Sequence, residues 1–139
     1  MKLFITLLVL VSSNFATTAQ NFNLKIVVEG IEEQKGTIYF SLHNKEDGFP
    51  SGNESAIKTG QTSEFSDIAV YTFQNLPKGT YAVSFFQDLN ANAELDTNFI
   101  GIPKEPVGAS NQDAFGRPKF SKSKFTLTED DTLRVGFMN

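Results

Sequence analysis

Apolar and polar residues alternate along at least six short segments, and this alternation constrains the fold more than any other feature of the sequence. Side chains at every second position share one face of a β-strand, so each segment predicts a strand with one buried face. The segments are 23–29, 37–43, 68–76, 81–85, 125–127 and 133–137. No stretch beyond residue 20 repeats apolar residues at helical spacing over three turns, and only one short helical turn is expected, within 51–58.

Short strands separated by turns predict a single antiparallel β-sandwich of about seven strands with one long ordered loop. The turn at Pro77 and Gly79 leads into Tyr81, whose hydroxyl is expected to reach the backbone, as in the tyrosine corner of immunoglobulin-like folds. This part of the chain also resembles prealbumin-like sandwiches. The last two strands are expected to pair as a hairpin across the acidic turn 129–131.

The first 19 residues have the layout of a signal peptide. Lys2 gives a short basic region, residues 3–11 are apolar, and the small residues Thr17 and Ala19 occupy the −3 and −1 positions of a cleavage site. The apolar run is about half of the roughly 20 residues that a spanning helix needs. We therefore expect cleavage after Ala19, a single domain at 20–139 and no transmembrane segment after cleavage.

Composition limits the chemistry that the chain can perform. It has no cysteine, which excludes disulfides, thiol catalysis and cysteine-bound zinc. Of its 14 phenylalanines, only Phe4 and Phe15 precede residue 20, so the domain can fill an aromatic core. The formal charge of −4 argues against nucleic acid as a partner. Lys119, Lys122 and Lys124 form the densest basic group, which we interpret as a solvated strand edge.

A run of oxygen-bearing side chains at every second residue predicts a calcium loop. Its members are Asp88, Asn90, Asn92, Glu94 and Asp96. Calcium loops use this spacing because one tight turn then directs several hard oxygens at one centre. The alternative is an Asx-rich turn, in which the same side chains accept hydrogen bonds from their own backbone.

Two departures from the strong calcium motif predict a weak site. Counted from Asp88, the sixth position holds Ala93 in place of the glycine that permits the sharp turn. The twelfth position holds Phe99, so the bidentate glutamate is missing. We expect any calcium affinity to fall in the range of roughly 10⁻⁴ to 10⁻³ M that is typical of extracellular modules.

Residues 99–120 are rich in glycine and proline, which indicates a shaped loop. Its aromatic and aliphatic side chains are expected to anchor it on the sandwich. A polar ligand groove on this loop is predicted from four residues, Lys104, Glu105, Asn111 and Arg117. The alternative is a structural Ω-loop that covers an open sheet edge.

No arrangement of residues predicts catalysis. His43 is the only histidine, and as a residue at a strand end it is expected to be solvated or hydrogen-bonded rather than part of a Ser-His-Asp triad. Carboxylate pairs drawn from Glu94, Asp96 and Glu105 would suit glycoside hydrolysis, and this remains the enzymatic alternative. We therefore expect no catalytic residues and no cofactor other than calcium.

The chain resembles the bacterial secreted family catalogued as domain of unknown function 2141. Five stretches carry the resemblance: Leu-Pro-x-Gly-x-Tyr-Ala at 76–82, an Asp-x-Asn-x-Asn loop at 88–92 followed by Asp96, Gly-Ile-Pro-Lys-Glu at 101–105, Gly-x-Ser-Asn at 108–111, and Phe-Gly-Arg-Pro at 115–118. Members commonly have His where this chain has Gln87, and Gly where it has Ala93. The resemblance implies an exported sandwich and no established biochemical role.

These features together predict an exported, non-catalytic binding or interaction module. The expected location is the periplasm or the extracellular space, and a signal peptide that ends in Ala19-Gln20 hints at a Gram-negative bacterium. The expected partner is a protein or a glycan of the envelope. The alternatives are a hydrolase that acts on envelope glycans through loop carboxylates, and a purely structural envelope protein.

Overall fold

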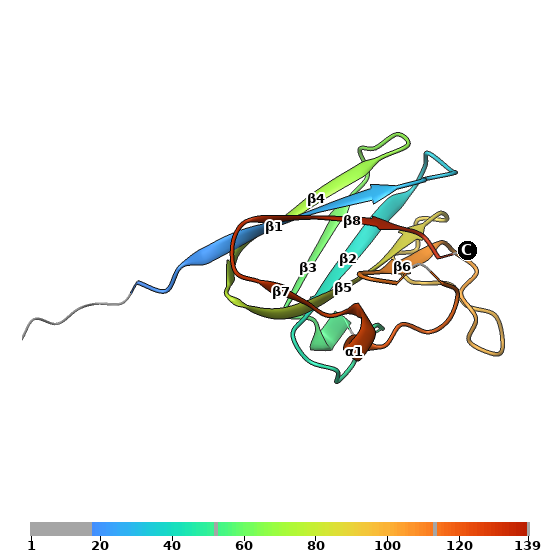
Figure 1. The fold of residues 1–139 in the computed structure, drawn as a ribbon. Coiled ribbons are helices and arrows are strands. Elements are labelled where there is room, and N and C mark those ends of the chain that lie inside the picture. Colours follow the sequence, from blue (N-terminus) through green and yellow to red (C-terminus); the bar gives the residue numbers. More distant parts are fainter. Residues whose placement is uncertain (1–17, 52, 113, 139) are drawn as a thin grey trace, which may run out of the picture.

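The computed structural model describes residues 18–51, 53–112 and 114–138. Of the predicted signal peptide, residues 1–17 lie outside this range. The described part of the chain folds into eight strands in two sheets, with one 3-10 turn and one helix of a single turn (Figure 1). The prediction of an all-β sandwich is confirmed.

The smaller sheet has three strands in the order β4-β1-β8. These strands are β1 (Asn21–Glu29), β4 (Ala69–Pro77) and β8 (Asp131–Gly136). β1 is antiparallel to β4 but parallel to β8, with Leu24 opposite Asp131 and Val28 opposite Val135. The expectation of a purely antiparallel sandwich is therefore wrong for one pair of strands.

The larger sheet has the order β3-β2-β5-β6, and β7 also pairs with β5. Its strands are β2 (Thr37–His43), β3 (Lys58–Thr62), β5 (Gly79–Asp88), β6 (Val107–Ala109) and β7 (Phe125–Leu127). The two helical turns are η1 (Asn53–Ser55) and α1 (Phe120–Ser123). η1 lies within the predicted 51–58, whereas no sequence pattern indicated α1.

The core lies between the inner faces of the two sheets. Alternate residues of β1 and β2 are fully buried, as the period of two predicted. Aromatic rings fill the centre, where Phe40 stacks on Tyr71 with ring centroids 5.3 Å apart and Tyr71 meets Phe73 edge-on. Such pairs stabilise a core beyond the area that they bury. The domain therefore depends on packing in place of disulfides.

The predicted tyrosine corner is present. The Tyr81 hydroxyl donates a hydrogen bond of 2.6 Å to the carbonyl oxygen of Pro77, four residues upstream. Its ring is buried in the main core, so the side chain fixes the turn at Gly79 to the interior. β5 begins at this turn and carries the candidate site at its other end.

The predicted C-terminal hairpin is wrong. β7 pairs with β5 in the larger sheet, whereas β8 pairs with β1 in the smaller one. Both strands bury a side chain in the same core, Leu127 from one sheet and Val135 from the other. The acidic turn therefore crosses between the two sheets, which local sequence cannot distinguish from a hairpin because both need polar turn residues.

Candidate functional site

The candidate site begins at Asp88, the last residue of β5. Its side chain is almost completely buried, at 1% exposure. One carboxylate oxygen accepts the backbone N–H groups of Asn90 (3.2 Å) and Ala91 (2.8 Å). The other accepts the N–H of Ala93 at 2.8 Å. The buried charge is therefore balanced by three backbone donors, which fold the chain tightly around it.

The two asparagines extend the same pattern. The side-chain oxygen of Asn90 accepts the N–H of Asn92 (3.2 Å), and that of Asn92 accepts the N–H of Glu94 (3.0 Å). Both side-chain amides donate to the carboxylate of Asp96, at 3.2 Å from Asn92. These are the hydrogen bonds of the Asx-rich turn, the alternative that the sequence left open.

Backbone strain accompanies the turn. Ala91 and Ala93 have φ of 62° and 61°, in the left-handed region that glycine occupies at lower cost. Ala93 occupies a position at which members of the family that this chain resembles commonly have glycine. The chain nevertheless adopts the conformation that a glycine would favour there, because Asp88 holds the N–H of Ala93 in place.

Glu105 lies further along the chain than the turn, but its side chain binds both ends of the turn. Its buried carboxylate accepts the backbone N–H of Leu89 at 2.8 Å and that of Asp96 at 3.1 Å. A hydrogen bond between backbone groups, from the N–H of Lys104 to the carbonyl of Asp96 (2.8 Å), also joins the two stretches. The sequence predicted Glu105 as a groove residue, or as one of a carboxylate pair for glycoside hydrolysis, and the structure shows that it fixes both ends of the turn.

The base of the turn rests on residues 33–36. Gln87 is buried and its amide donates to the carbonyl oxygens of Glu33 (2.6 Å) and Lys35 (2.8 Å). Gly36, at φ 78°, lies so close that a Cβ there would be 2.0 Å from the carbonyl oxygen of Asp88. A larger residue at Gly36 would therefore displace the end of β5.

Residues 98–102 form a second, smaller turn, which we name the tip. The side-chain oxygen of Asn98 accepts the N–H groups of Ile100 (3.0 Å) and Ile102 (2.9 Å). Its own backbone N–H donates to the carbonyl of Ile102, and its carbonyl accepts the N–H of Gly101. One asparagine therefore organises the whole turn.

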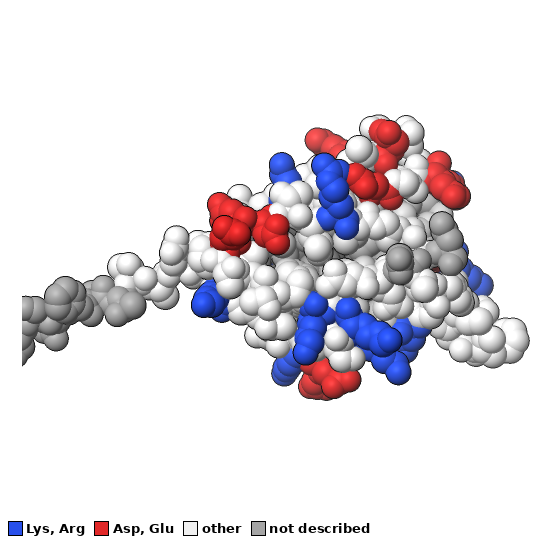
Figure 2. All heavy atoms as spheres, in the orientation of Figure 1, with Lys and Arg blue, Asp and Glu red and all other residues white. Residues whose placement is uncertain are grey.

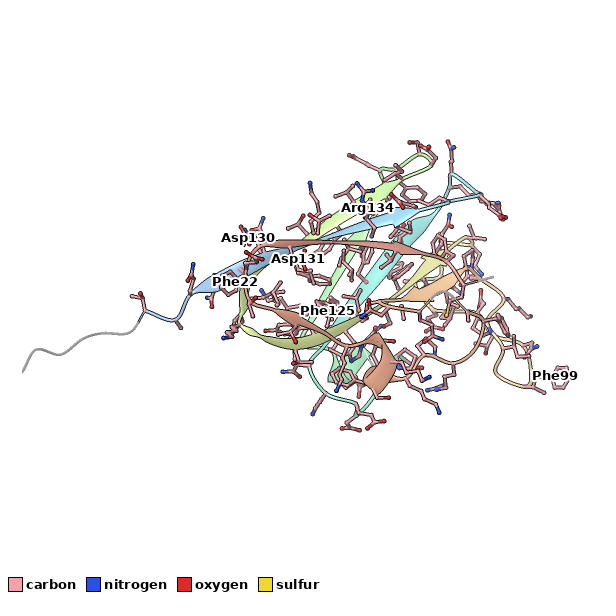
Figure 3. All side chains as sticks on the ribbon, in the orientation of Figure 1. Phe22, Phe99, Phe125, Asp130, Asp131 and Arg134 are labelled. Carbon is pink, nitrogen blue, oxygen red and sulfur yellow. The ribbon has the colours of Figure 1, made fainter. Side chains whose placement is uncertain are left out.

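The tip projects away from the sandwich. Phe99 is 98% exposed and Ile100 is 65% exposed, and Figure 3 shows Phe99 pointing outward from the end of its loop. Phe115, further along the segment, is also exposed. The prediction that the apolar side chains of this loop anchor it on the sandwich is wrong for these three residues, because hydrogen bonds shape the loop instead. It holds for Phe120, which packs against Phe49.

The segment returns to the sandwich at β6. Gly108 lies against Phe85, where a Cβ would come within 2.2 Å of the ring. The buried hydroxyl of Ser110 accepts the N–H of Val83 (3.0 Å) and donates to the carbonyl of Ser123 (2.6 Å). The loop thus covers the edge of β5, as the Ω-loop alternative anticipated.

The four predicted groove residues make separate contacts. Arg117 donates to the hydroxyl of Ser51 (3.2 Å), and Asn111 donates to the carbonyl of Lys124 (3.0 Å). Lys104 is exposed, and Glu105 is buried beneath the turn. Within the described part of the chain, no hydrogen bond or ion pair joins any two of the four. A shared groove formed by them stays a prediction.

Two open depressions lie elsewhere on the described surface. An open depression of about 480 Å³ lies over the outer face of the smaller sheet. Figure 3 labels two of the residues beside it, Asp130 and Asp131. This depression is lined by Asn23, Lys25, Thr72, Asp130, Asp131 and Thr132. A second, of about 410 Å³, runs between β3 and β4. Among residues 18–51, 53–112 and 114–138, no three His, Cys, Asp or Glu side chains gather as a metal-binding group.

His43 departs from its expected surroundings. It is fully buried, and neither ring nitrogen has a hydrogen-bond partner among the described residues. Its ring meets Phe49 edge-on, with centroids 5.2 Å apart. Burial lowers the pKa of His43, because the charged ring would lose its hydration. The expectation of a solvated or hydrogen-bonded histidine is wrong, since Phe49 covers this end of β2.

Comparison with known proteins identifies the family. The family model described as "Uncharacterized protein conserved in bacteria (DUF2141)" matches residues 26–134. The chain belongs to the DUF2141 family. No curated protein and no solved structure matches it. None of the helices in the described part of this DUF2141 chain has the length and apolar character needed to cross a membrane.

The geometry explains why the DUF2141 resemblance lies in separated stretches. The Asp-x-Asn-x-Asn turn and the Gly-Ile-Pro-Lys-Glu stretch form one unit, because Glu105 accepts backbone donors from Leu89 and Asp96. In the next stretch, Gly108 permits close packing and Ser110 fixes the return of the chain. These residues therefore hold segment 88–119 in its observed shape on the sandwich.

Proposed function

We propose that this chain is an exported, non-catalytic binding module of the bacterial envelope, and that segment 88–119 is its binding surface. One observation carries the proposal: the segment is held in a fixed shape by buried polar side chains, yet it keeps large apolar side chains exposed. Phe99, Ile100 and Phe115 are 98%, 65% and 68% exposed. Phe99 and Ile100 are adjacent in the chain, and neighbouring exposed apolar side chains on an ordered segment mark interaction sites.

Two carboxylates of the segment, those of Glu105 and Asp96, support binding over hydrolysis. Glu105 is buried and accepts two backbone N–H groups, so it faces the protein rather than a substrate. Asp96 accepts the side-chain amides of Asn90 and Asn92. A glycosidase needs one carboxylic acid and one carboxylate that both reach the sugar. These two side chains serve the fold, which favours the non-catalytic function.

Export, and an immunoglobulin-like or prealbumin-like topology, belong to the same proposal. The signal-peptide pattern of residues 1–19 supports export to the periplasm or beyond. The tyrosine corner at Tyr81 and the parallel pairing of β1 with β8 support the topology. The partner we expect is a protein or a glycan of the envelope.

Photo-crosslinking in the bacterium that encodes the chain tests this function. A photoreactive amino acid at position 104 or 115 should give products that a protease or a glycosidase degrades, because both positions are exposed on the segment. The same amino acid at position 68 serves as the control, since Ile68 is 44% exposed but lies outside the segment. Equal products at all three positions, or none, would contradict a protein or glycan partner for this segment.

Calcium binding by the Asp88–Asp96 turn stays a prediction of the sequence. The turn already satisfies its oxygens internally, so a cation would require the amides of Asn90 and Asn92 to present oxygen in place of nitrogen. If it binds, calcium at tenfold above its Kd will stabilise the domain by about 1.4 kcal/mol. We expect Asp96→Asn to abolish this gain and Asp130→Asn to leave it unchanged. Thermal unfolding at millimolar calcium measures it, and an unshifted midpoint in the wild type contradicts the metal site.

A further inference from the structure

The tip has the shape of a small convex knob. Phe99 and Ile100 are both exposed, and Figure 3 shows open space around Phe99 at the end of its loop. A stable protein interface buries roughly 800 Å² on each partner, far more than two side chains provide. Insertion into the interface of a lipid bilayer needs only that apolar side chains enter the boundary between headgroups and acyl chains. The shape therefore favours lipid over a protein surface.

The tip is also ordered before it meets a partner. Asn98 makes four hydrogen bonds across the turn, two through its side chain and two through its backbone. Phe99 is therefore held outward by the turn itself and does not depend on a contact for its position. Because the turn is already formed, docking would cost little conformational entropy.

The stretch from the start of the tip to residue 128 has a charge opposite to that of the whole chain, and the carboxylates of Glu94 and Asp96 lie just before it. Residues 97–128 hold five of the 12 basic residues and two of the 16 acidic ones, a formal charge of +3 in a chain of −4. The five basic residues are all exposed: Lys104, Arg117, Lys119, Lys122 and Lys124. Glu105, one of the two acidic residues, is buried. The exposed charge of this region is therefore that of a surface attracted to anions.

The basic side chains and the tip share one side of the molecule. Figure 2 shows basic side chains along the lower side, with one acidic group among them, and the uncharged knob at the lower right. Most acidic side chains gather at the upper right and at the left end. α1 lies on the lower side as well (Figure 1), flanked by Lys119 and Lys124 and carrying Lys122. One flat surface can therefore meet the knob and the lysines together.

We propose that the tip and these basic residues dock the domain on an anionic lipid bilayer. Phe99 and Ile100 enter the interface, and the lysines lie over the headgroups. Apolar insertion together with basic attraction is the combination that gives stable peripheral binding. The inference rests on one part of the proposed function, which is that segment 88–119 is a binding surface. It adds that the tip contacts a bilayer.

Vesicle sedimentation tests the proposal with the chain that begins at Gln20. Every strand of the described residues lies between Asn21 and Gly136, so this chain retains the fold, and it lacks the apolar residues 3–11 that would bind lipid themselves. We expect it to sediment with vesicles of equal parts phosphatidylglycerol and phosphatidylcholine. Binding to phosphatidylcholine alone should be weaker, and added salt should weaken binding to the anionic vesicles.

Two pairs of substitutions separate the apolar and the electrostatic contributions. Phe99→Ser with Ile100→Ser should weaken binding by about tenfold or more, because both apolar side chains leave the interface. Lys119→Glu with Lys122→Glu should reduce binding to anionic vesicles only. The matched control is Ile68→Ser with Val70→Ser, two half-exposed residues away from the tip, which should leave binding unchanged.

Three results would overturn lipid docking: no sedimentation of the folded wild type with anionic vesicles, equal binding by the tip variant, or an equal loss in the control variant. Near-ultraviolet circular dichroism establishes that each variant is folded. If vesicle binding fails but crosslinks form at positions 104 and 115, the proposed function stays intact, and segment 88–119 contacts a protein or a glycan in place of a bilayer. If the chain binds vesicles but gives no crosslinks at these positions, the bilayer remains as the target and a protein or glycan partner does not.

Discussion

Replacing Asp88 by Ala is expected to lower the free energy of unfolding by about 3 kcal/mol. The carboxylate is buried and accepts three backbone N–H groups, from Asn90, Ala91 and Ala93. Bonds to a charged acceptor each contribute about 1.5–3 kcal/mol, and part of this returns when the freed N–H groups reach water. Urea unfolding, monitored by circular dichroism, measures the loss.

Two other substitutions show whether the loss comes from the buried carboxylate. Asp88→Asn keeps one accepting oxygen, so we expect about half of the loss. Asn92→Ala removes exposed contacts from the same turn and should cost less than about 1 kcal/mol. If Asp88→Ala unfolds at the same urea concentration as the wild type, the turn is not held by its carboxylate.

The sequence predicted those parts of the fold that depend on local alternation. β1 and β2 place alternate apolar residues on the core, and β1, β2, β4 and β5 were each expected close to their observed positions. β3 was missed because it is polar and mostly exposed, and β6 because it has three residues within a loop rich in glycine and proline. Such strands form through their partners rather than through their own pattern.

The candidate site divides in the same way. The turn at Asp88 follows from side chains that bond to neighbours two to five residues away, so the spacing made it visible. Glu105 contacts Leu89 across 16 residues, and no spacing rule predicts that contact. The exposure of Phe99 was missed for a related reason, because composition favours burial of aromatic residues and only the Asn98 turn holds this one outward.

Acidification is expected to destabilise the domain through His43. Burial lowers the pKa of the folded-state histidine below the unfolded value of 6.5, so the unfolded chain binds one more proton between the two values. The free energy of unfolding should therefore fall as the pH drops below 6.5, by up to about 1.4 kcal/mol per pH unit, until the folded-state pKa is reached. Above pH 6.5 the stability contributed by the neutral ring is fully present.

The variant His43→Leu isolates this effect. Leucine is similar in volume and leaves no polar atom unpaired, so the variant should be at least as stable as the wild type near neutral pH. Its stability should change less between about pH 7 and 5, a range in which most carboxylates stay ionised. Urea unfolding across this range provides the comparison. Equal slopes for the two proteins would mean that the folded histidine takes up its proton freely.

The position of His43 also indicates which part of the molecule should open first in acid. Phe49, which the His43 ring contacts, belongs to a small cluster with Ala82 and Ala109 that is separate from the main core, and Phe120 of α1 packs against this cluster. Opening of this small cluster exposes the charged His43 ring to water and restores its hydration. Opening of the main core does not expose the ring. Hydrogen exchange at about pH 5.5 should therefore rise in 44–50 and 120–124 before it rises in β1. A simultaneous rise in all three regions would instead mean that protonation unfolds the domain as a whole.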